Sequence, residues 1–163
     1  MRMKTVAHWL QVETFKRGDH GEKDDFGRSA YNRYYYAAYL AARRVLKSIY
    51  GEGSQFDHAN LPNYLETTVK NDIKKVKNDA KRTGDQELSD QCGRANNAAL
   101  ELAKIFRAAY AVRVTADYQP EVRVTFLGAD RFTLNGVDIS RAHEWPDQVE
   151  FYASQIQSVS RSF

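Results

Sequence analysis

Hydrophobic and polar positions follow a helical period over most of the first 118 residues. Between about residues 26 and 50, Tyr31, Tyr35, Ala38 and Ala42 recur at the spacing that places side chains on one face of a helix. No glycine or proline interrupts the run from residue 28 to 50, and its alanines, leucines and arginines are strong helix formers. The alanines have so little side chain that a neighbouring helix can approach closely. We therefore predict a long central helix that packs on several sides.

Apolar stripes at helical spacing predict three further helices, over residues 4–16, from 61 to the break at 81–84, and from about 85 to 112. The polar, glycine-containing stretch 17–27 is typical of a loop. Leu61-Pro62 opens its helix because a proline is tolerated in the first turn. Gly93 lies inside the last of these helices and is tolerated where another helix crosses closely.

The pattern changes to strand periodicity after Tyr118. Val122, Val124 and Phe126 alternate with polar residues, and turn signals follow them, which predicts a small β-hairpin. A final amphipathic helix starts at Ser140, where a proline in the first two turns kinks it or marks its true start. The expected fold is mainly α. It is an up-and-down bundle of four to five helices, with residues 1–118 as the helical core and 119–163 as a hairpin plus a C-terminal helix packed on that core.

Charge, cysteine content and the lack of long apolar runs exclude some classes of protein but do not identify one. The chain has 163 residues, 28% of them charged, and a net charge of +3, which permits contact with nucleic acid without requiring it. Cys92 is the only cysteine, so no internal disulfide forms, and a buried thiol is a more probable role for it than a nucleophile. There is no signal-peptide pattern and no apolar run of membrane-spanning length, and we expect a cytoplasmic protein without membrane contact.

Metal and cofactor chemistry is not expected from the residue pattern. The four histidines are widely separated in sequence, and there is neither a pair of cysteines nor a glycine-rich phosphate loop. We therefore predict no metal site and no cofactor.

Arginines and tyrosines interleave in the central helix in a way that suits RNA. Arg28 precedes the aromatic run, and Arg33 lies beside Tyr34 and Tyr35. Arginine offers a planar fork for phosphate, and tyrosine offers a ring on which a base stacks. These four residues are the candidate RNA-binding set. The alternative, which the residue types alone favour, is a structural helix whose arginines pair with acids or stack on the rings.

A second candidate segment, Arg113 to Tyr118, follows the last long helix. If the helix continues, Arg113 and Asp117 share a face, and an ion pair between them would fix the direction of the arginine. The alternative is a plain helix C-terminus with a favourable cation and a capping tyrosine.

Together the two segments resemble the signature of the HEPN superfamily, the small helical domains of prokaryotic toxins, CRISPR effectors and phage-defence proteins. The run Arg33-Tyr-Tyr-Tyr-Ala-Ala-Tyr-Leu-Ala-Ala-Arg43 is similar to the family's first motif, and Arg113-Val-Thr-Ala-Asp-Tyr118 resembles its second in place and shape. The helical order agrees over about residues 1–118.

The resemblance implies metal-independent cleavage of RNA at a site shared by two copies of the chain. Active members have a histidine after the arginine with four to six residues between the two, whereas this chain has Tyr118 at the first such position. In this interpretation Arg113 stabilises the phosphate charge, Asp117 orients Arg113, and Tyr118 acts as acid or positioner. A tyrosine is a poor base near neutral pH, because its ordinary pKa is about 10.

Cleavage of RNA and binding without catalysis are close to even, because the histidine is missing, and the functional hypotheses are the following. One is a HEPN-like protein of the defence or toxin type that binds RNA or cleaves it as a variant endoribonuclease. The other is a non-catalytic HEPN-like scaffold that contacts a nucleotide or a protein partner from a defence or toxin–antitoxin operon. A purely structural dimer is a third. A homodimer is expected from the small-residue and aromatic faces of the central helix, and from the family.

Overall fold

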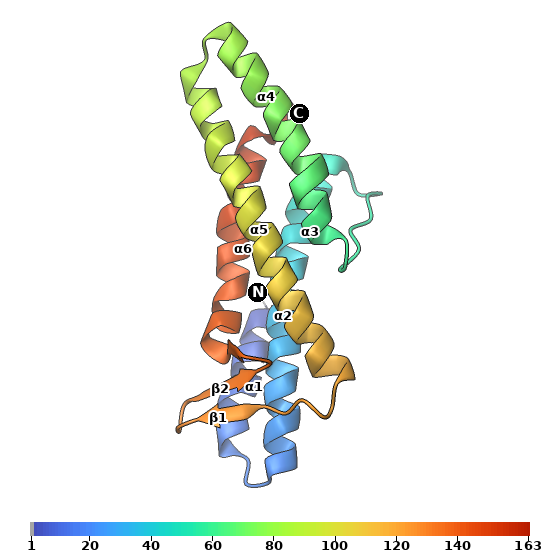
Figure 1. Cartoon of the computed structure of the whole chain (residues 1–163), viewed down its shortest axis with the longest axis vertical. Helices are drawn as coiled ribbons and strands as arrows, with labels where there is room; N and C mark the ends of the chain where they lie inside the picture. Colours follow the sequence, from blue (N-terminus) through green and yellow to red (C-terminus); the bar gives the residue numbers. More distant parts are fainter. Residues whose placement is uncertain (1) are drawn as a thin grey trace. The chain divides into compact units, whose positions relative to one another are not determined.

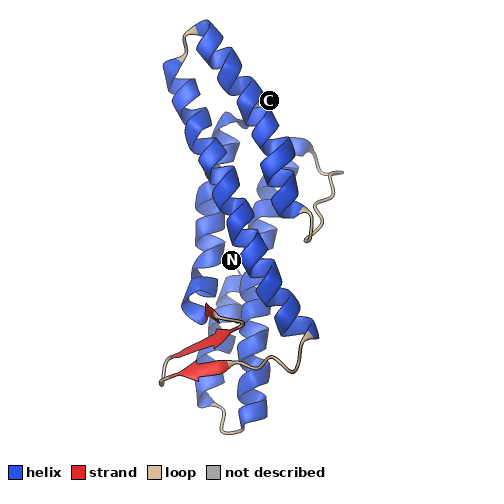
Figure 2. Ribbon diagram, viewed as in Figure 1, coloured by secondary structure: helices blue, strands red, loops and turns tan. Residues whose placement is uncertain are grey.

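The computed structural model describes residues 2–163, and most of them are helical, as the sequence predicts (Figures 1 and 2). The elements in chain order are α1 (Arg2–Lys16), α2 (His20–Tyr50), α3 (Leu61–Tyr64), the π-helical turn η1 (Leu65–Val69), α4 (Lys70–Thr83), α5 (Gln86–Tyr118), β1 (Thr125–Leu127), β2 (Arg131–Leu134), β3 (Val137–Asp138), α6 (Ile139–Val159) and the 3₁₀ turn η2 (Ser160–Ser162). The predicted mainly α fold, with a small β element before a C-terminal helix, is confirmed.

The described chain forms two compact units. The first unit contains the residues up to Tyr39 together with Ala108–Asp147, and the second contains Leu40–Arg107 together with Gln148–Phe163. Helices α2, α5 and α6 each contribute residues to both units. The predicted division at residue 118 stays a prediction.

Helix α2 begins earlier than the sequence suggested, because residues 20–27 are helical rather than a loop. The Asp19 carboxylate accepts a hydrogen bond from the Glu22 N–H at 3.0 Å, which satisfies one of the free N–H groups of the first turn. Gly27 is buried, and a Cβ at this position would lie 3.1 Å from Val124 Cγ2. A glycine therefore stands within this helix because the chain that leads into β1 packs against its backbone.

The core of the first unit joins α2 to the sheet. The strands are antiparallel in the order β1-β2-β3, with Phe126 opposite Phe132. The Tyr31 ring lies edge-on to Phe132, and its hydroxyl donates a 2.5 Å hydrogen bond to the Val137 carbonyl. Asn135 turns the chain into β3 with a positive φ of 50°. The sequence predicted the hairpin and this turn, but not the third strand, which is only two residues long.

The second unit is helical throughout its regular structure. The caps of α3 and η1 are themselves helical, so residues 61–83 form one continuous helix. The apolar positions predicted for one face are buried at Leu65, Val69, Ile73 and Val76. Helix α6 starts at Ile139 and carries Pro146 inside it.

The small-residue faces of α2 are covered by the chain itself. Ala37, Ala38, Ala41 and Ala42 are at most 4% exposed. These faces therefore give no reason of their own for a dimer, although the homodimer stays a prediction of the resemblance. No helix in residues 2–163 combines the length and the apolar character that crossing a membrane requires.

Candidate functional site

Arg113 and Asp117 form the predicted ion pair in the last turns of α5. Arg113 Nε lies 2.9 Å from Asp117 Oδ2, and the other carboxylate oxygen accepts a 2.7 Å hydrogen bond from Asn32 Nδ2 of α2. The carboxylate thus holds the arginine on one side and α2 on the other. Within the first unit, the two segments singled out in the sequence lie side by side.

Three tyrosine rings surround the Arg113 guanidinium. Its Cζ lies 5.9 Å from the ring centre of Tyr36, 6.0 Å from that of Tyr110 and 5.6 Å from that of Tyr118. Burial opposes the charged form, but Tyr36, Asp117 and Tyr118 outweigh it and raise the pKa of Arg113 above its ordinary value. Arg113 is therefore a permanent cation against aromatic faces, where a cation is attracted by the ring electrons.

The Arg113 guanidinium keeps hydrogen-bonding capacity to spare. Among the residues that the structure describes, its one hydrogen bond is a long one, 3.4 Å from Nη2 to the Tyr36 hydroxyl. Its Nε faces Asp117 closely but is not aligned for a hydrogen bond. The side chain is 15% exposed, so it is neither sealed inside the fold nor free in solvent. An anion that reaches it would find several unused N–H donors.

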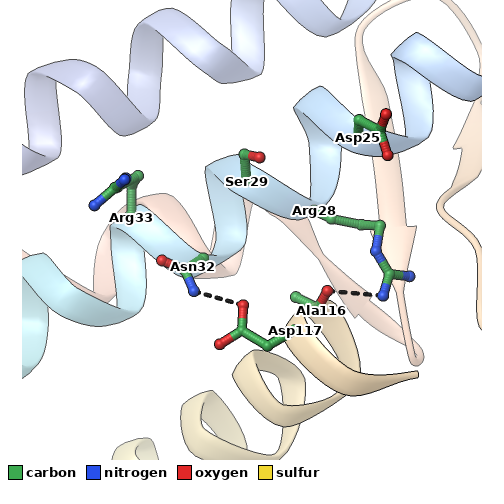
Figure 3. Close-up of a pocket in the computed structure, with 7 residues that line it drawn as sticks. All are labelled: Asp25, Arg28, Ser29, Asn32, Arg33, Ala116 and Asp117. Carbon is green, nitrogen blue, oxygen red and sulfur yellow. Dashed lines mark hydrogen bonds between the residues drawn. The ribbon is translucent and has the colours of Figure 1, made fainter. Parts of the chain in front are cut away.

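A polar hollow of about 400 Å³ lies beside this ion pair (Figure 3). Its lining comes from α2 and the end of α5: Asp25, Arg28, Ser29, Asn32, Arg33, Ala116 and Asp117. Figure 3 shows Asn32 and Asp117 facing each other in the middle, with Arg33 and Asp25 towards opposite ends. Arg33 is exposed, and no residue in the range 2–163 accepts a hydrogen bond or ion pair from it. The hollow therefore has a free cation at one end and hydrogen-bonding groups at its centre.

Arg28 has a structural task that the sequence did not reveal. Its guanidinium donates to the carbonyls of Val122 at 2.6 Å, Thr115 at 2.8 Å, Ala116 at 2.7 Å and Gln119 at 3.1 Å. The Thr115 and Ala116 carbonyls lie in the last turn of α5, where a helix leaves carbonyls without partners inside the helix and where a cation also meets the negative end of the helix dipole. Arg28 caps α5, and we do not assign it a contact with RNA.

Tyr34 and Tyr35 also belong to the fold rather than to a surface. Both residues are fully buried, so neither ring presents a face on which a base could stack. The Tyr34 hydroxyl donates to Gln11 Oε1 at 2.6 Å and lies 2.8 Å from His143 Nδ1. Burial raises the pKa of both phenols above the ordinary value, so both keep their protons at neutral pH. The expectation that they contact RNA is corrected accordingly.

Tyr118, in contrast, has an exposed ring on which a base could stack. It is 67% exposed at the end of α5, while its inner face lies over the Arg113 guanidinium. Sequence reasoning found Arg113, Asp117 and Tyr118 but missed Asn32 and Tyr36. The signal for those two was their four-residue spacing, which puts them on one face of α2 just as Arg113 and Asp117 share a face of α5.

The groups around the hollow favour binding over proton transfer. No histidine lines it, and the Asp117 carboxylate is already engaged by Arg113 and Asn32. Among residues 2–163, no group of three or more histidine, cysteine, aspartate or glutamate side chains is placed to hold a metal ion. The arrangement offers a cation for phosphate, an exposed ring for a base, and amide and carboxylate groups for a base edge.

Comparison of the chain with protein-family models, with curated proteins and with solved structures gave no match. The HEPN resemblance therefore remains a hypothesis that rests on the two motif segments.

Proposed function

We propose that this chain is a HEPN-like RNA-binding protein of the prokaryotic defence or toxin type. The observation that carries the proposal is the state of Arg113. It is a partly buried cation with unused donors, held by Asp117 beside the exposed Tyr118 ring. Single-stranded nucleic acid is bound by this pairing of a cation for the backbone with a ring for a base.

Each residue has a distinct role in the proposed complex. Arg113 and Arg33 bind phosphate oxygens, and Tyr118 stacks on an unpaired base. Asn32 and Asp117 hydrogen-bond to a base edge or a ribose hydroxyl. An unpaired strand is the form of RNA whose bases are free to stack and to present their edges.

The test uses a short, labelled, single-stranded RNA and fluorescence anisotropy in excess EDTA. Tyr118→Ala should weaken binding by about 10- to 100-fold, because one base–aromatic stack is worth about 1–3 kcal/mol. Arg33→Gln should flatten the dependence of log affinity on log salt by about 0.7, the loss of one phosphate contact. Arg161→Gln, at an exposed arginine of the second unit, is the control and should leave both quantities unchanged. Equal affinity of the Tyr118→Ala and unsubstituted proteins would refute the proposal.

The same reactions distinguish cleavage from binding. The second candidate function is the metal-independent endoribonuclease, favoured by a cation that could stabilise the charge of a cleaved phosphate. Shortened RNA that appears in EDTA and disappears in Arg113→Gln would establish it. Intact RNA with saturable retention supports binding alone. A chain that retains no RNA would instead fit the scaffold that contacts a nucleotide or a protein partner.

A homodimer is part of the proposal. Val6, Trp9 and Val12 are each at least 40% exposed and recur on one face of α1, which gives an apolar stripe for a second copy. Light scattering should then give twice the chain mass of 18.7 kDa at tens of micromolar, and Trp9→Glu should halve it. A single-chain mass for the unsubstituted protein would remove the dimer from the proposal and leave RNA binding standing.

A further inference from the structure

A second hollow, of about 380 Å³, lies in the second unit along one face of α4. Its lining includes the carboxylate of Glu66 from η1, Lys70, Lys74 and Lys77 of α4 and Asn96 of α5, together with the buried Ile73. We call this hollow the lysine groove. Its lysines are not part of the Arg113 site, and the proposed function does not use them.

The acids near the lysine groove are already engaged by other groups. Glu66 pairs with both terminal nitrogens of Arg107. Asp72 binds Lys75 at 3.1 Å and accepts a hydrogen bond from the Tyr50 hydroxyl at 3.0 Å.

The three lysines of the groove make no close ion pair within the described chain. Among residues 2–163, Lys70, Lys74 and Lys77 have no partner in an ion pair or hydrogen bond. Helix α4 carries six basic side chains and only two acidic ones. The groove therefore carries three lysines against a single carboxylate, that of Glu66, which Arg107 already binds and which also attracts Lys70.

The spacing of these charges suits a polyanionic strand. Residues three and four apart lie on the same side of a helix, and each such step advances about 4.5–6 Å at about 1.5 Å per residue. Lys70, Lys74 and Lys77 thus line up along about 10 Å of the helix axis. The amides of Asn71 and Asn96 add neutral donors along the same row.

A protein partner fits this surface poorly. Lysine is depleted in protein–protein interfaces, whose centres are rich in aromatic and apolar side chains. The large exposed apolar residues in the range 2–163 include none from α4 and none from the Gln86–Arg107 part of α5. The groove has no ring on which a base could stack, so it cannot read a sequence through stacking.

We propose that the lysine groove binds the phosphate backbone of a nucleic-acid strand without regard to sequence. Lys70, Lys74 and Lys77 each contact a phosphate, and Asn71 and Asn96 donate to phosphate oxygens or sugar. The inference rests on the proposed function only for the identity of RNA as the natural strand. Phosphate contacts of this kind act equally on single-stranded DNA.

The test is a salt titration of binding to uniform single-stranded RNA and, separately, to DNA of the same length. The groove variant is Lys70→Gln/Lys74→Gln/Lys77→Gln. Its slope of log affinity against log salt should be shallower by about 2, because each phosphate contact contributes about 0.7. The charge-matched control is Lys75→Gln/Arg82→Gln/Lys104→Gln, which removes three cations that already pair with acids in the same unit. Its slope should change by less than about 0.7.

Each remaining outcome has a clear meaning, provided that circular dichroism shows both triple variants folded. An unchanged slope in the groove variant overturns the inference, and so does an equal change in the control, which would indicate net charge alone. In a competition experiment, polyglutamate that displaces the bound strand as effectively as unlabelled RNA would also overturn the inference.

The proposals for the groove and for the Arg113 site can be refuted separately. Loss of affinity in Tyr118→Ala with no effect of the groove variant leaves the Arg113 site and removes the groove. If the groove variant gives a shallower salt slope for DNA while Tyr118→Ala does not change RNA affinity, the groove stands and the Arg113 site is refuted.

Discussion

Two arginines of α2 that look alike in the sequence differ completely in their surroundings. Arg28 donates hydrogen bonds to four backbone carbonyls and is 8% exposed, whereas Arg33 is exposed at the rim of the hollow. Hydrogen bonds from a charged donor are worth about 1.5–3 kcal/mol each, and a buried carbonyl left without a donor is costly. Arg28 is therefore a stability residue, and Arg33 is free to serve function.

Arg28→Gln should lower the free energy of unfolding by at least about 2 kcal/mol, because glutamine cannot reach four carbonyls. Arg33→Gln should change it by less than about 0.5 kcal/mol, as exposed substitutions usually do. Urea unfolding of the two variants measures both values. Similar stabilities for the two variants would contradict the capping role of Arg28.

His143 makes stability depend on pH in a predictable direction. Burial lowers the pKa of His143 below its ordinary value, and the nearby Lys4 and His8 lower it further, against Asp147 and Glu144, which raise it. The unfolded chain therefore binds this proton first as pH falls below about 6.5. The contribution of His143 to the free energy of unfolding is complete above that pH and is lost as pH falls towards the folded pKa.

The melting temperature should consequently fall less between pH 7.5 and pH 5.5 in His143→Gln than in the unsubstituted protein. The Tyr34 hydroxyl, 2.8 Å from Nδ1, keeps its proton throughout this range. His20→Gln, at an exposed histidine, is the control and should retain the full pH dependence. Identical pH profiles for His143→Gln and the unsubstituted protein would rule out this assignment.

Among the elements, glycines show how packing overrides local pattern. The sequence places Gly27 in a loop and Gly93 at a close helix crossing, and the structure reverses both expectations. A Cβ at Gly27 would lie 3.1 Å from Val124 Cγ2 and 3.3 Å from the Phe132 ring, whereas a Cβ at Gly93 would meet only Lys77 Nζ at 3.8 Å. The tight approach is therefore at Gly27.

Gly27→Ala and Gly93→Ala should change stability in opposite directions. Both gain helix propensity worth about 0.8–1 kcal/mol. At Gly27 the added methyl group must push Val124 and Phe132 aside, which costs about 1–3 kcal/mol and gives a net loss. At Gly93 there is room, so the free energy of unfolding should rise by about 0.5–1 kcal/mol. Thermal unfolding of the pair checks both signs, and a stabilised Gly27→Ala would show that the contact relaxes freely.

Periodicity predicted the helices well because each repeats an apolar face that the structure buries. The residues 65–76 show this, since their predicted face is buried. The pattern did not predict where α2 begins, because the partners of Gly27 lie about a hundred residues further along the chain. The Arg28 cap was hidden for the same reason, since its carbonyl partners are 87 to 94 residues away. By contrast, the Arg113–Asp117 pair was predictable, because one turn of helix determines it.

On the scale of the whole chain, three helices contribute residues to both units. Helices α2, α5 and α6 run without a break through the boundaries at residues 39/40, 107/108 and 147/148. Unfolding one unit would therefore end three helices in mid-course and leave their terminal N–H and C=O groups without partners. Restarting each helix would also carry the cost of a new nucleus. The units should not unfold separately.

Two probes with different coverage can test this cooperativity in one urea titration. Both tryptophans, Trp9 and Trp145, belong to the first unit, so their fluorescence reports on that unit alone. Far-UV circular dichroism reports the helices of both. We expect the two curves to share one midpoint and one slope, as a two-state transition requires. A fluorescence transition complete at a lower urea concentration than the dichroism transition would show that the second unit persists alone, and that the continuous helices do not couple the two.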